Sequence, residues 1–336
     1  MDIDIVVLWV DGNDPAWLEE KTKYLNTKTT DANAVNRFRD WGLMKYWFRA
    51  IENYAPWVRK IHFVTWGHTP DFLKLEHPKL HVVRHEDFLP EECLPTFNSC
   101  AIEMSIHKIE GLAEHFIFFN DDMFLLRPIS EQCFFCNGLP VAEGYEKFEA
   151  PVGVPMVWQS HFYNDLGIIN KWFPKRDAVR ANRNKFIHPA YGFRNNARTL
   201  LLQHLSKNRF VGFAFPHSAS AFCKESFCSL WKAEPELLQE TTSHRFRDRG
   251  DLNQWVVQWW QIASGKFYPG KIDNGKFYAE SWMTDAICEA IQTQSHDMIC
   301  INDPDVPIDF EMVSRRIQNA FESILPNKCS FEKEAD

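Results

Sequence analysis

The sequence lacks any apolar run of about 18 residues, the length that suggests a membrane-spanning helix. Its start, MDIDIVVLWVDGNDP, opens with acidic residues and lacks the basic region of a signal peptide. Internal repeats and low-complexity linkers are also missing. We therefore expect a cytoplasmic protein without a transmembrane segment, in a chain long enough for one large α/β domain or two modest ones.

The sequence has fewer basic than acidic residues. The 336 residues include 37 Lys and Arg against 45 Asp and Glu, which gives a net charge of -8. Proteins that bind nucleic acid normally carry a basic domain or stripe, so a nucleic-acid partner is not expected. The basic residues that are present can still cluster locally around a small phosphate ligand.

The cysteines do not form a recognisable metal framework. Nine are present at irregular spacing, and Cys133 and Cys136 are the one pair with CxxC spacing. No second pair follows to complete a zinc site, so we interpret these two as buried free thiols. An odd number of cysteines fits a reducing cytosol.

Aromatic residues, in contrast, are abundant. They make up 15% of the chain, with 13 Trp and 28 Phe. Most should pack in the core, because aromatic side chains dominate buried area in globular proteins. Some could instead provide stacking platforms for sugars or a nucleobase.

Hydrophobic patterning predicts alternating strands and helices. Strands are expected at residues 3–10, 60–66, 80–84, 115–120 and 298–301, and helices at 37–54, 98–109 and 279–292. This alternation indicates βαβ units and a mainly parallel sheet flanked by helices, which is an α/β fold. The basic segment from about 170 to 210 is predicted to be a helical insert in the second half, and the charged tail 327–336 is predicted to be frayed.

Acidic turns follow two of the predicted strands. Ligands of parallel sheets bind beyond the carboxyl ends of the strands, where the turns around Asp11 and Asp121 would lie. The adjacent Asp121 and Asp122 suit a divalent cation that bridges phosphates, although a solvated turn is the simpler alternative. Asn302 and Asp303 follow another predicted strand and could add ligands to the same cation.

Arginines alternate with other residues in two short motifs. Arg37, Arg39 and Asp40 precede the first long helix, and His244, Arg245 and Arg247 repeat the alternation downstream. Alternating arginines in extended backbone form a fork that suits phosphate oxygens, although surface salt bridges would explain each motif taken singly.

A histidine ends a further apolar run. His217 follows residues 211–215 and could act as a general base towards a hydroxyl nucleophile. A structural histidine is the alternative, since 13 histidines are present.

Five blocks of the sequence resemble the four conserved regions of the Stealth family, in family order. They are IDIVVLWVDGNDP, RFRDWGLMKYWFRAIENYAPWVRKIHFVTWG, NSCAIEMSIHKIEGLAEHFIFFNDDMFLLRPI, HSASAFCKESFCSLW with HRFRDRGDLNQW, and ICINDPD. The resemblance spans residues 3 to about 305. The family includes bacterial capsular and exopolysaccharide sugar-1-phosphate transferases and the catalytic subunit of the lysosomal-enzyme N-acetylglucosamine-1-phosphotransferase.

The resemblance implies a GT-A-like fold, a single catalytic domain over residues 1–326, a divalent cation (Mg²⁺ or Mn²⁺), a nucleotide-sugar donor and a glycan acceptor. It also leaves room for peripheral association with a membrane-bound capsule assembly machinery. The residues it points to are assigned here by chemistry: a catalytic set of His217, Asp40, Arg39, Arg247 and His244; a nucleotide-binding set of Trp9, Asp11, Gly12, Arg37 and Arg245; and metal ligands Asp121, Asp122, Asn302 and Asp303.

The expected reaction transfers a hexose or hexosamine 1-phosphate, from a donor such as UDP-N-acetylhexosamine, to a glycan hydroxyl in capsule or exopolysaccharide synthesis. Nucleoside monophosphate would leave, as in other phosphoryl transfers. Two alternatives remain open: a conventional metal-dependent glycosyltransferase that releases nucleoside diphosphate, and a glycan-binding module without catalysis.

Overall fold

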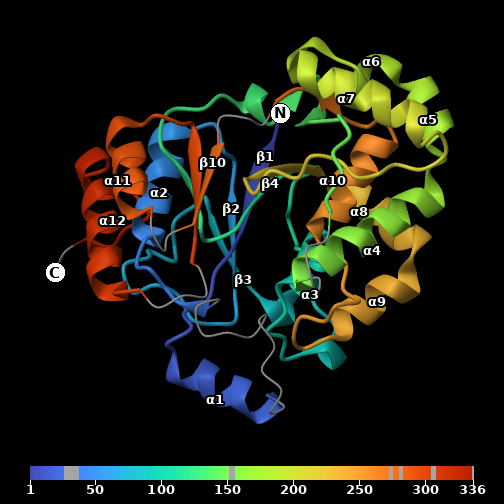
Figure 1. The fold of residues 1–336 in the computed structure, drawn as a ribbon. Helices are drawn as coiled ribbons and strands as arrows, with labels where there is room; N and C mark the ends of the chain where they lie inside the picture. The colour runs from blue at the N-terminus through green and yellow to red at the C-terminus, as the bar shows by residue number, and fades with distance from the viewer. Residues whose placement is uncertain (26–37, 151–155, 272–274, 280–282, 304–307, 335–336) are drawn as a thin grey trace.

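The computed structural model describes residues 1–25, 38–150, 156–271, 275–279, 283–303 and 308–334. Its central sheet has five strands in the order β3-β2-β1-β4-β8 (Figure 1). The first four strands are mutually parallel and β8 runs antiparallel to β4. The strands are β1 (Ile3–Leu8), β2 (Ile61–Thr65), β3 (Leu80–Arg84), β4 (His115–Phe119) and β8 (Ser220–Cys223).

Helices cover both faces of this sheet, which explains why its strands are apolar almost throughout. In β1, Ile3, Ile5 and Val7 join one buried cluster while Val6 joins the other. The first cluster lies under α2 (Met44–Tyr54), α11 (Thr284–Thr293) and α12 (Phe310–Ile324). The second lies under α3 (Ser99–Ser105), α4 (Val157–Trp172), α8 (Lys224–Ala233), α9 (Pro235–Ser243) and α10 (Gln254–Ala263).

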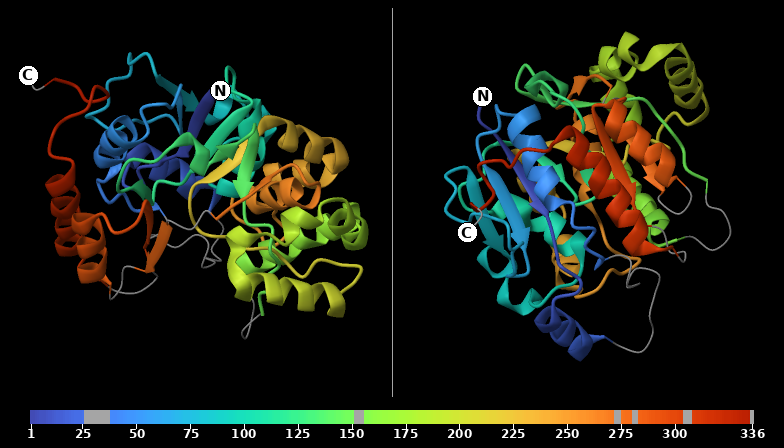
Figure 2. Two further views of the ribbon diagram at one scale, coloured as in Figure 1. Left: turned by 90° about the horizontal axis from the view of Figure 1, so that it is seen from above. Right: turned by 90° about the vertical axis from the view of Figure 1, so that its left-hand side faces the viewer.

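Two small sheets and four further helices complete the described fold. One sheet has the order β10-β11-β5 and the other β6-β7-β9. Their strands are β5 (Met123–Leu125), β6 (Phe135–Cys136), β7 (Leu139–Ala142), β9 (Tyr268–Pro269), β10 (Gly275–Ala279) and β11 (Met298–Asn302). The helices are α1 (Pro15–Tyr24), α5 (Lys175–Ala181), α6 (Arg183–Phe186) and α7 (Gly192–Leu205); α5 to α7 lie on the opposite side of the molecule from α11 and α12 (Figure 2).

The predicted α/β class is confirmed, with a mainly parallel sheet between helices that is consistent with a GT-A-like fold. Two predicted helices have wrong boundaries. The first begins at Met44 instead of residue 37, because Gly42 has φ +67° and its N–H donates to Asp40 Oδ1 (3.0 Å), which makes a turn. The other begins at Thr284, since residues 275–279 form β10. Within the described residues, no helix combines the length and apolarity needed to cross a membrane.

The prediction of a frayed tail is wrong for the part of it that the structure describes. Cys329 and Phe331 are buried in the core, and the backbone N–H of Lys74 donates to Phe331 O (2.8 Å). The predicted thiols at 133 and 136 are free, as expected, but they are half-buried instead of buried.

A buried ion pair fastens the tail to α2. Arg49 donates from Nε to Glu332 Oε1 (2.7 Å), from a terminal nitrogen to Oε2 (3.0 Å), and from the other to Leu325 O (2.7 Å). Burial alone would raise the pKa of Glu332, but the hydrogen bonds from Arg49 hold it below its ordinary value. The pair therefore stabilises the fold at neutral pH, and this contribution is lost as the pH falls through the lowered pKa of Glu332.

We predict that Arg49→Met lowers the free energy of unfolding by roughly 3–5 kcal/mol, because it leaves a buried carboxylate without its partner. Urea unfolding monitored by circular dichroism measures the change. Arg84→Met, which breaks the exposed pair with Glu86, serves as a matched control and should change stability by less than about 1 kcal/mol. Equal losses in the two variants would contradict the assigned role of Arg49.

Candidate active site

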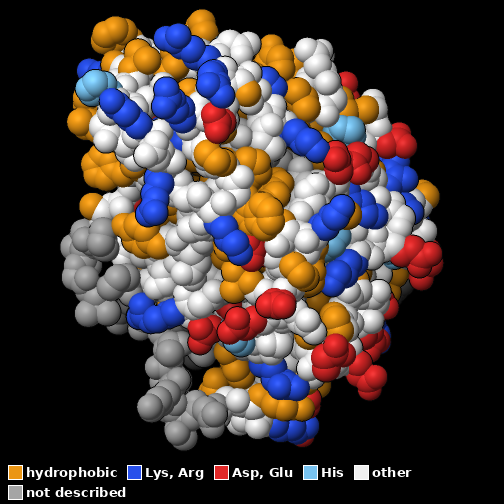
Figure 3. Space-filling model, turned by 90° about the vertical axis from the view of Figure 1, so that its right-hand side faces the viewer, with side chains coloured by type: hydrophobic (Ala, Val, Ile, Leu, Met, Phe, Trp, Pro, Cys, Tyr) orange, Lys and Arg blue, Asp and Glu red, His pale blue; other side chains and the backbone are white. Residues whose placement is uncertain are grey.

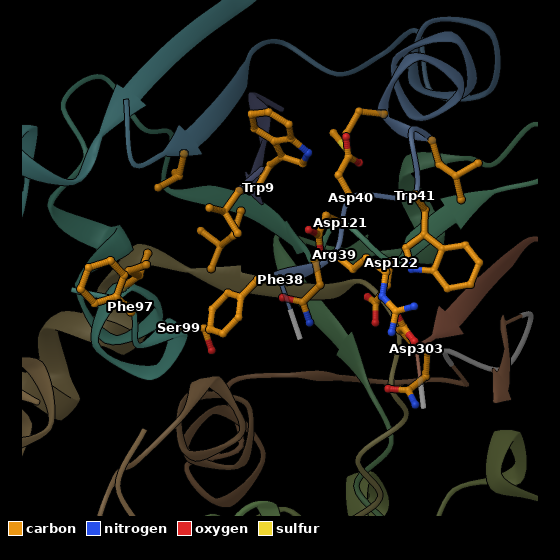
Figure 4. A pocket seen from close by; sticks show the side chains of 18 of the residues that line it. Trp9, Phe38, Arg39, Asp40, Trp41, Phe97, Ser99, Asp121, Asp122 and Asp303 are labelled. Atoms are coloured by element: carbon orange, nitrogen blue, oxygen red, sulfur yellow. The ribbon is translucent and has the colours of Figure 1, made fainter. Parts of the chain in front are cut away.

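A pocket of about 260 Å³ opens at the carboxyl ends of β1 and β4. These strands lie at the point where the strand order of the sheet reverses, since β2 follows on one side of β1 and β4 on the other. Ligands of open α/β sheets bind at such a point. Trp9 follows β1 and Asp121 follows β4, and both line the pocket (Figure 4).

Strand β11 brings a second pair of polar residues to the same place. It pairs antiparallel with β5, with Cys300 opposite Met123, and the N–H of Ile301 donates to Asp122 O (2.9 Å). Asn302 and Asp303 follow directly and line the pocket with Asp121 and Asp122. All four predicted metal ligands thus face one cavity.

The negative charges in the pocket need compensation. Surrounding protein atoms and the carboxylates of Asp122 and Asp40 raise the pKa of Asp121 to about 8, although water still reaches its side chain from the pocket. Burial and the charge of Asp11 also raise the pKa of Asp40. Asp122 Oδ1 is buried and accepts no hydrogen bond from the residues that the structure describes. Oxygen ligands with this excess of negative charge suit a hard divalent cation.

Two arginines from distant parts of the chain reach the pocket. Arg39 Nε lies 3.1 Å from Asp303 Oδ2, and its guanidinium lies over the Phe310 ring at 4.6 Å. Arg247 donates to Ser99 Oγ (2.7 Å). Figure 4 shows Arg39 at the same end of the pocket as Asp122 and Asp303, with Ser99 towards the other end.

His217 lies beside the acidic pair. Its Nε2 is 3.5 Å from Asp122 Oδ2. Burial disfavours the charged imidazolium, but the hydrogen bond and charge of Asp122, with a smaller effect of Glu103, outweigh it and raise the pKa of His217. Asp122, His217 and Cys300 hold their potential ligand atoms within 4.8 Å of one another. The histidine can therefore accept a proton next to the acidic cluster.

The fully buried Asp251 holds the segment 244–251 in place through its hydrogen bonds. Its carboxylate lies 2.6 Å from His244 Nδ1 and accepts from Asn98 Nδ2 (2.8 Å) and from the N–H of Asp248 (2.8 Å). Asn98 also caps α3 by accepting from the N–H of Cys100 (3.0 Å). This network fixes the loop that carries Arg247 against the start of α3.

The turn after β1 contacts His68 and Phe38. The N–H of Asp11 donates to His68 Nε2 (2.8 Å). At Gly12 a Cβ atom would lie 1.8 Å from the carbonyl oxygen of Phe38, so only glycine lets these two backbone segments approach. Phe38 lines the pocket and is held in place by this contact.

The structure gathers most of the predicted site residues and separates a few. The pocket is lined by Trp9, Arg39, Asp40, Asp121, Asp122, His217, Arg247, Asn302 and Asp303. Four others lie outside the lining: Asp11, Gly12, His244 and Arg245. Arg37 falls outside the described residues. The role of each of these residues remains a prediction.

Sequence reasoning missed the aromatic end of the pocket. Trp17 lies 5.0 Å from Phe38 and 5.6 Å from Phe97, ring centre to ring centre. Phe97 stacks in turn on Phe246 at 5.3 Å. The alternation Arg-Phe-Arg in both arginine motifs was the available signal, since each motif contributes its central phenylalanine to this cluster.

Comparisons with known proteins fit this arrangement. Conserved regions 1, 2 and 4 of Stealth proteins match residues 1–29, 37–141 and 289–336. The chain is 36% identical over 345 residues to the capsular polysaccharide phosphotransferase WcwK of Streptococcus pneumoniae, covering 98% of both chains. This chain belongs to the Stealth family. The family assignment made from the sequence is confirmed, and with it the expectation of a transferase enzyme.

Two other relatives show the same extent of similarity. The exopolysaccharide phosphotransferase cps2G of Lactiplantibacillus plantarum is 39% identical over 334 residues, covering 99% of this chain and 96% of the relative. The receptor polysaccharide phosphotransferase WefC of Streptococcus gordonii is 36% identical over 336 residues, covering 98% of both. The similarity of these relatives to this chain therefore extends over the whole described fold.

We predict that Mn²⁺ binds with an affinity that rises with pH up to about 8, because Asp121 must lose its proton to become a ligand. Between about pH 6 and pH 8 the apparent affinity should increase about tenfold per pH unit. Isothermal titration calorimetry at a series of pH values measures it.

The matched variants are Asp121→Asn and Asp285→Asn, the latter at an exposed acid on α11. The first should bind Mn²⁺ weakly at every pH, and the second should behave as wild type. A wild-type affinity that does not change with pH would show that Asp121 is not a ligand.

Proposed function

We propose that this Stealth protein transfers a hexose or hexosamine 1-phosphate from a nucleotide-diphosphate sugar to a hydroxyl of a glycan, with release of nucleoside monophosphate. Its role would be in capsule or exopolysaccharide synthesis, the processes after which its relatives are named. UDP-N-acetylhexosamine is the donor that we favour.

The proposal rests above all on the position of Arg39 and Arg247, which line the same pocket as the four predicted ligands of a cation. Guanidinium groups pair well with phosphate oxygens. They suit a transition state whose charge lies on the oxygens around phosphorus. Transfer of a glycosyl group instead develops positive charge on the sugar ring, where carboxylates help more.

His217 is the residue that we assign as general base. In the proposed step the acceptor hydroxyl oxygen attacks the phosphorus next to the sugar, and the hydroxyl proton passes to the imidazole ring of His217. The bond from that phosphorus to the bridging oxygen breaks, and nucleoside monophosphate leaves with this oxygen. Asp122 lies 3.5 Å from Nε2 and stabilises the imidazolium that forms.

Asp121, Asp122, Asn302 and Asp303 are the residues that would hold a divalent cation, Mg²⁺ or Mn²⁺. A bound cation would supply positive charge at the donor pyrophosphate. Arg39 keeps Asp303 oriented through the ion pair of 3.1 Å. Asp121 and Asp122 are fixed by the end of β4 and by the bond from Ile301 to Asp122.

The aromatic end of the pocket is suited to the flat part of a ligand. Phe38 and Phe97 both pack against Trp17 there. Phe38 precedes Arg39 in the sequence, and the backbone N–H of Phe97 donates to Arg245 O (2.7 Å). A nucleobase or a sugar ring can stack on such a surface. We therefore place the donor along the pocket, with its pyrophosphate at the acidic end.

We predict that a reaction with UDP-N-acetylhexosamine and a capsule-type oligosaccharide yields a phosphodiester-linked product and an equal amount of UMP. Phosphorus NMR and mass spectrometry of the product measure both. The acceptor should gain the mass of sugar plus phosphate. Release of UDP with a gain of sugar alone would make the chain a conventional glycosyltransferase, and binding of glycan without any product would make it a binding module.

We also predict that Arg39→Lys and Arg247→Lys each lower kcat/KM, because lysine cannot reproduce the planar two-pronged contact with phosphate oxygens. Losing such a charge-assisted pair costs roughly 1.5–3 kcal/mol of transition-state stabilisation, or about 10- to 150-fold in rate. Arg180→Lys, at an exposed arginine of α5 that pairs with Asp177 and does not line the pocket, is the control. Rates near wild type in both pocket variants would reduce these residues to structural ion pairs.

A further inference from the structure

Charge is distributed very unevenly along this acidic chain. Residues 171–209 contain ten Lys and Arg and a single acid, Asp177, whereas the whole chain has a net charge of -8. This segment begins at the end of α4 and includes α5, α6 and α7. The excess of positive charge therefore belongs to one structural unit on one side of the molecule (Figure 1).

Three of these basic residues have structural roles. Lys175 is buried and lies 2.8 Å from Glu146 Oε1. Lys185 donates to the carbonyl oxygens of Gly265 (2.7 Å) and Phe267 (2.9 Å), and Arg198 donates to Glu146 O (3.0 Å). These contacts hold α5, α6 and α7 in place against the rest of the protein.

Most of the exposed basic residues have no such role. Among the residues that the structure describes, five exposed ones make no ion pair with a carboxylate: Arg176, Arg183, Arg194, Lys207 and Arg209. Figure 3 shows Lys and Arg side chains across the upper part of this face, over α5–α7, with hydrophobic side chains between them. Positive charge left free at a surface is available to an anionic partner.

Helix α7 adds an apolar face that points outward. Phe193 is 88% exposed, Leu205 69%, Leu201 56% and Leu200 47%. Their spacing places them on one side of the helix. Thr199, on the other side, is the residue of α7 that is buried. This orientation is the reverse of an ordinary surface helix, whose apolar side faces the core.

We propose that the α5–α7 surface, residues 175–209, docks the protein onto an anionic lipid bilayer. Basic side chains would approach lipid phosphates, while Phe193 and the leucines of α7 would enter the boundary between headgroups and acyl chains. A soluble polyanion would use the positive charge but not the four exposed apolar side chains. The combination of the two therefore favours a membrane over a free anionic polysaccharide. This inference concerns a surface outside the active-site pocket and does not depend on the proposed reaction.

The test measures binding of the purified full chain to vesicles by co-sedimentation. Wild type should bind vesicles that contain phosphatidylglycerol, bind pure phosphatidylcholine vesicles much more weakly, and dissociate as salt increases. Two variants separate the contributions: Phe193→Ser/Leu201→Ser/Leu205→Ser removes apolar contacts, and Arg176→Gln/Arg183→Gln/Arg194→Gln removes charge. Each should weaken binding at least about tenfold.

A matched control changes exposed apolar residues elsewhere, Leu75→Ser/Met312→Ser, and should bind as wild type does. Circular dichroism and the melting temperature establish that every variant is folded. Equal vesicle binding by all variants would overturn the proposal. It would also be overturned if wild type did not bind vesicles and both wild type and the serine variant bound heparin. A third contrary result would be that wild type is a dimer in analytical ultracentrifugation, the serine variant is a monomer, and neither binds vesicles.

Discussion

The parallel pairing of β1 with β4 is the contact on which the rest of the site depends. Val7 lies beside Phe119 in this register, so the two strands end together. The turn that begins at Trp9 and the pair Asp121–Asp122 are thereby placed at one edge of the sheet. Everything else in the pocket is added around these two turns by longer-range contacts, from α2, from β11 and from the loop that carries Arg247.

The electrostatics of the pocket follow from this crowding. Several carboxylates share a small volume, and burial together with the charges of Asp122 and Asp40 raises the pKa of Asp121. Arg39 and Arg247 approach from distant parts of the chain and supply positive charge. A site built in this way suits a negatively charged ligand that binds together with a cation, because the cation would balance the charges of both the carboxylates and the ligand.

The sequence was informative where a structural rule is local. Buried strands such as β2 and the acidic turn at Asp121 follow from apolar runs and turn residues, so they could be predicted. The aromatic cluster of Trp17, Phe97 and Phe246 could not, because it joins residues that are far apart in the chain. The contact of Ile301 with Asp122 is of the same kind. The tail was also misjudged: charge near a terminus suggests fraying, yet Glu332 is neutralised by Arg49 and buried.

The contribution of β11 has a consequence for how the protein is made. During synthesis, β1 to β4 emerge from the ribosome long before β11, so the sheet can form while the pocket still lacks one wall. Until residues 298–303 arrive, β5 has an open edge and Asp122 lacks the contact from Ile301. The active-site pocket can therefore be completed only after residues 298–303 have been translated.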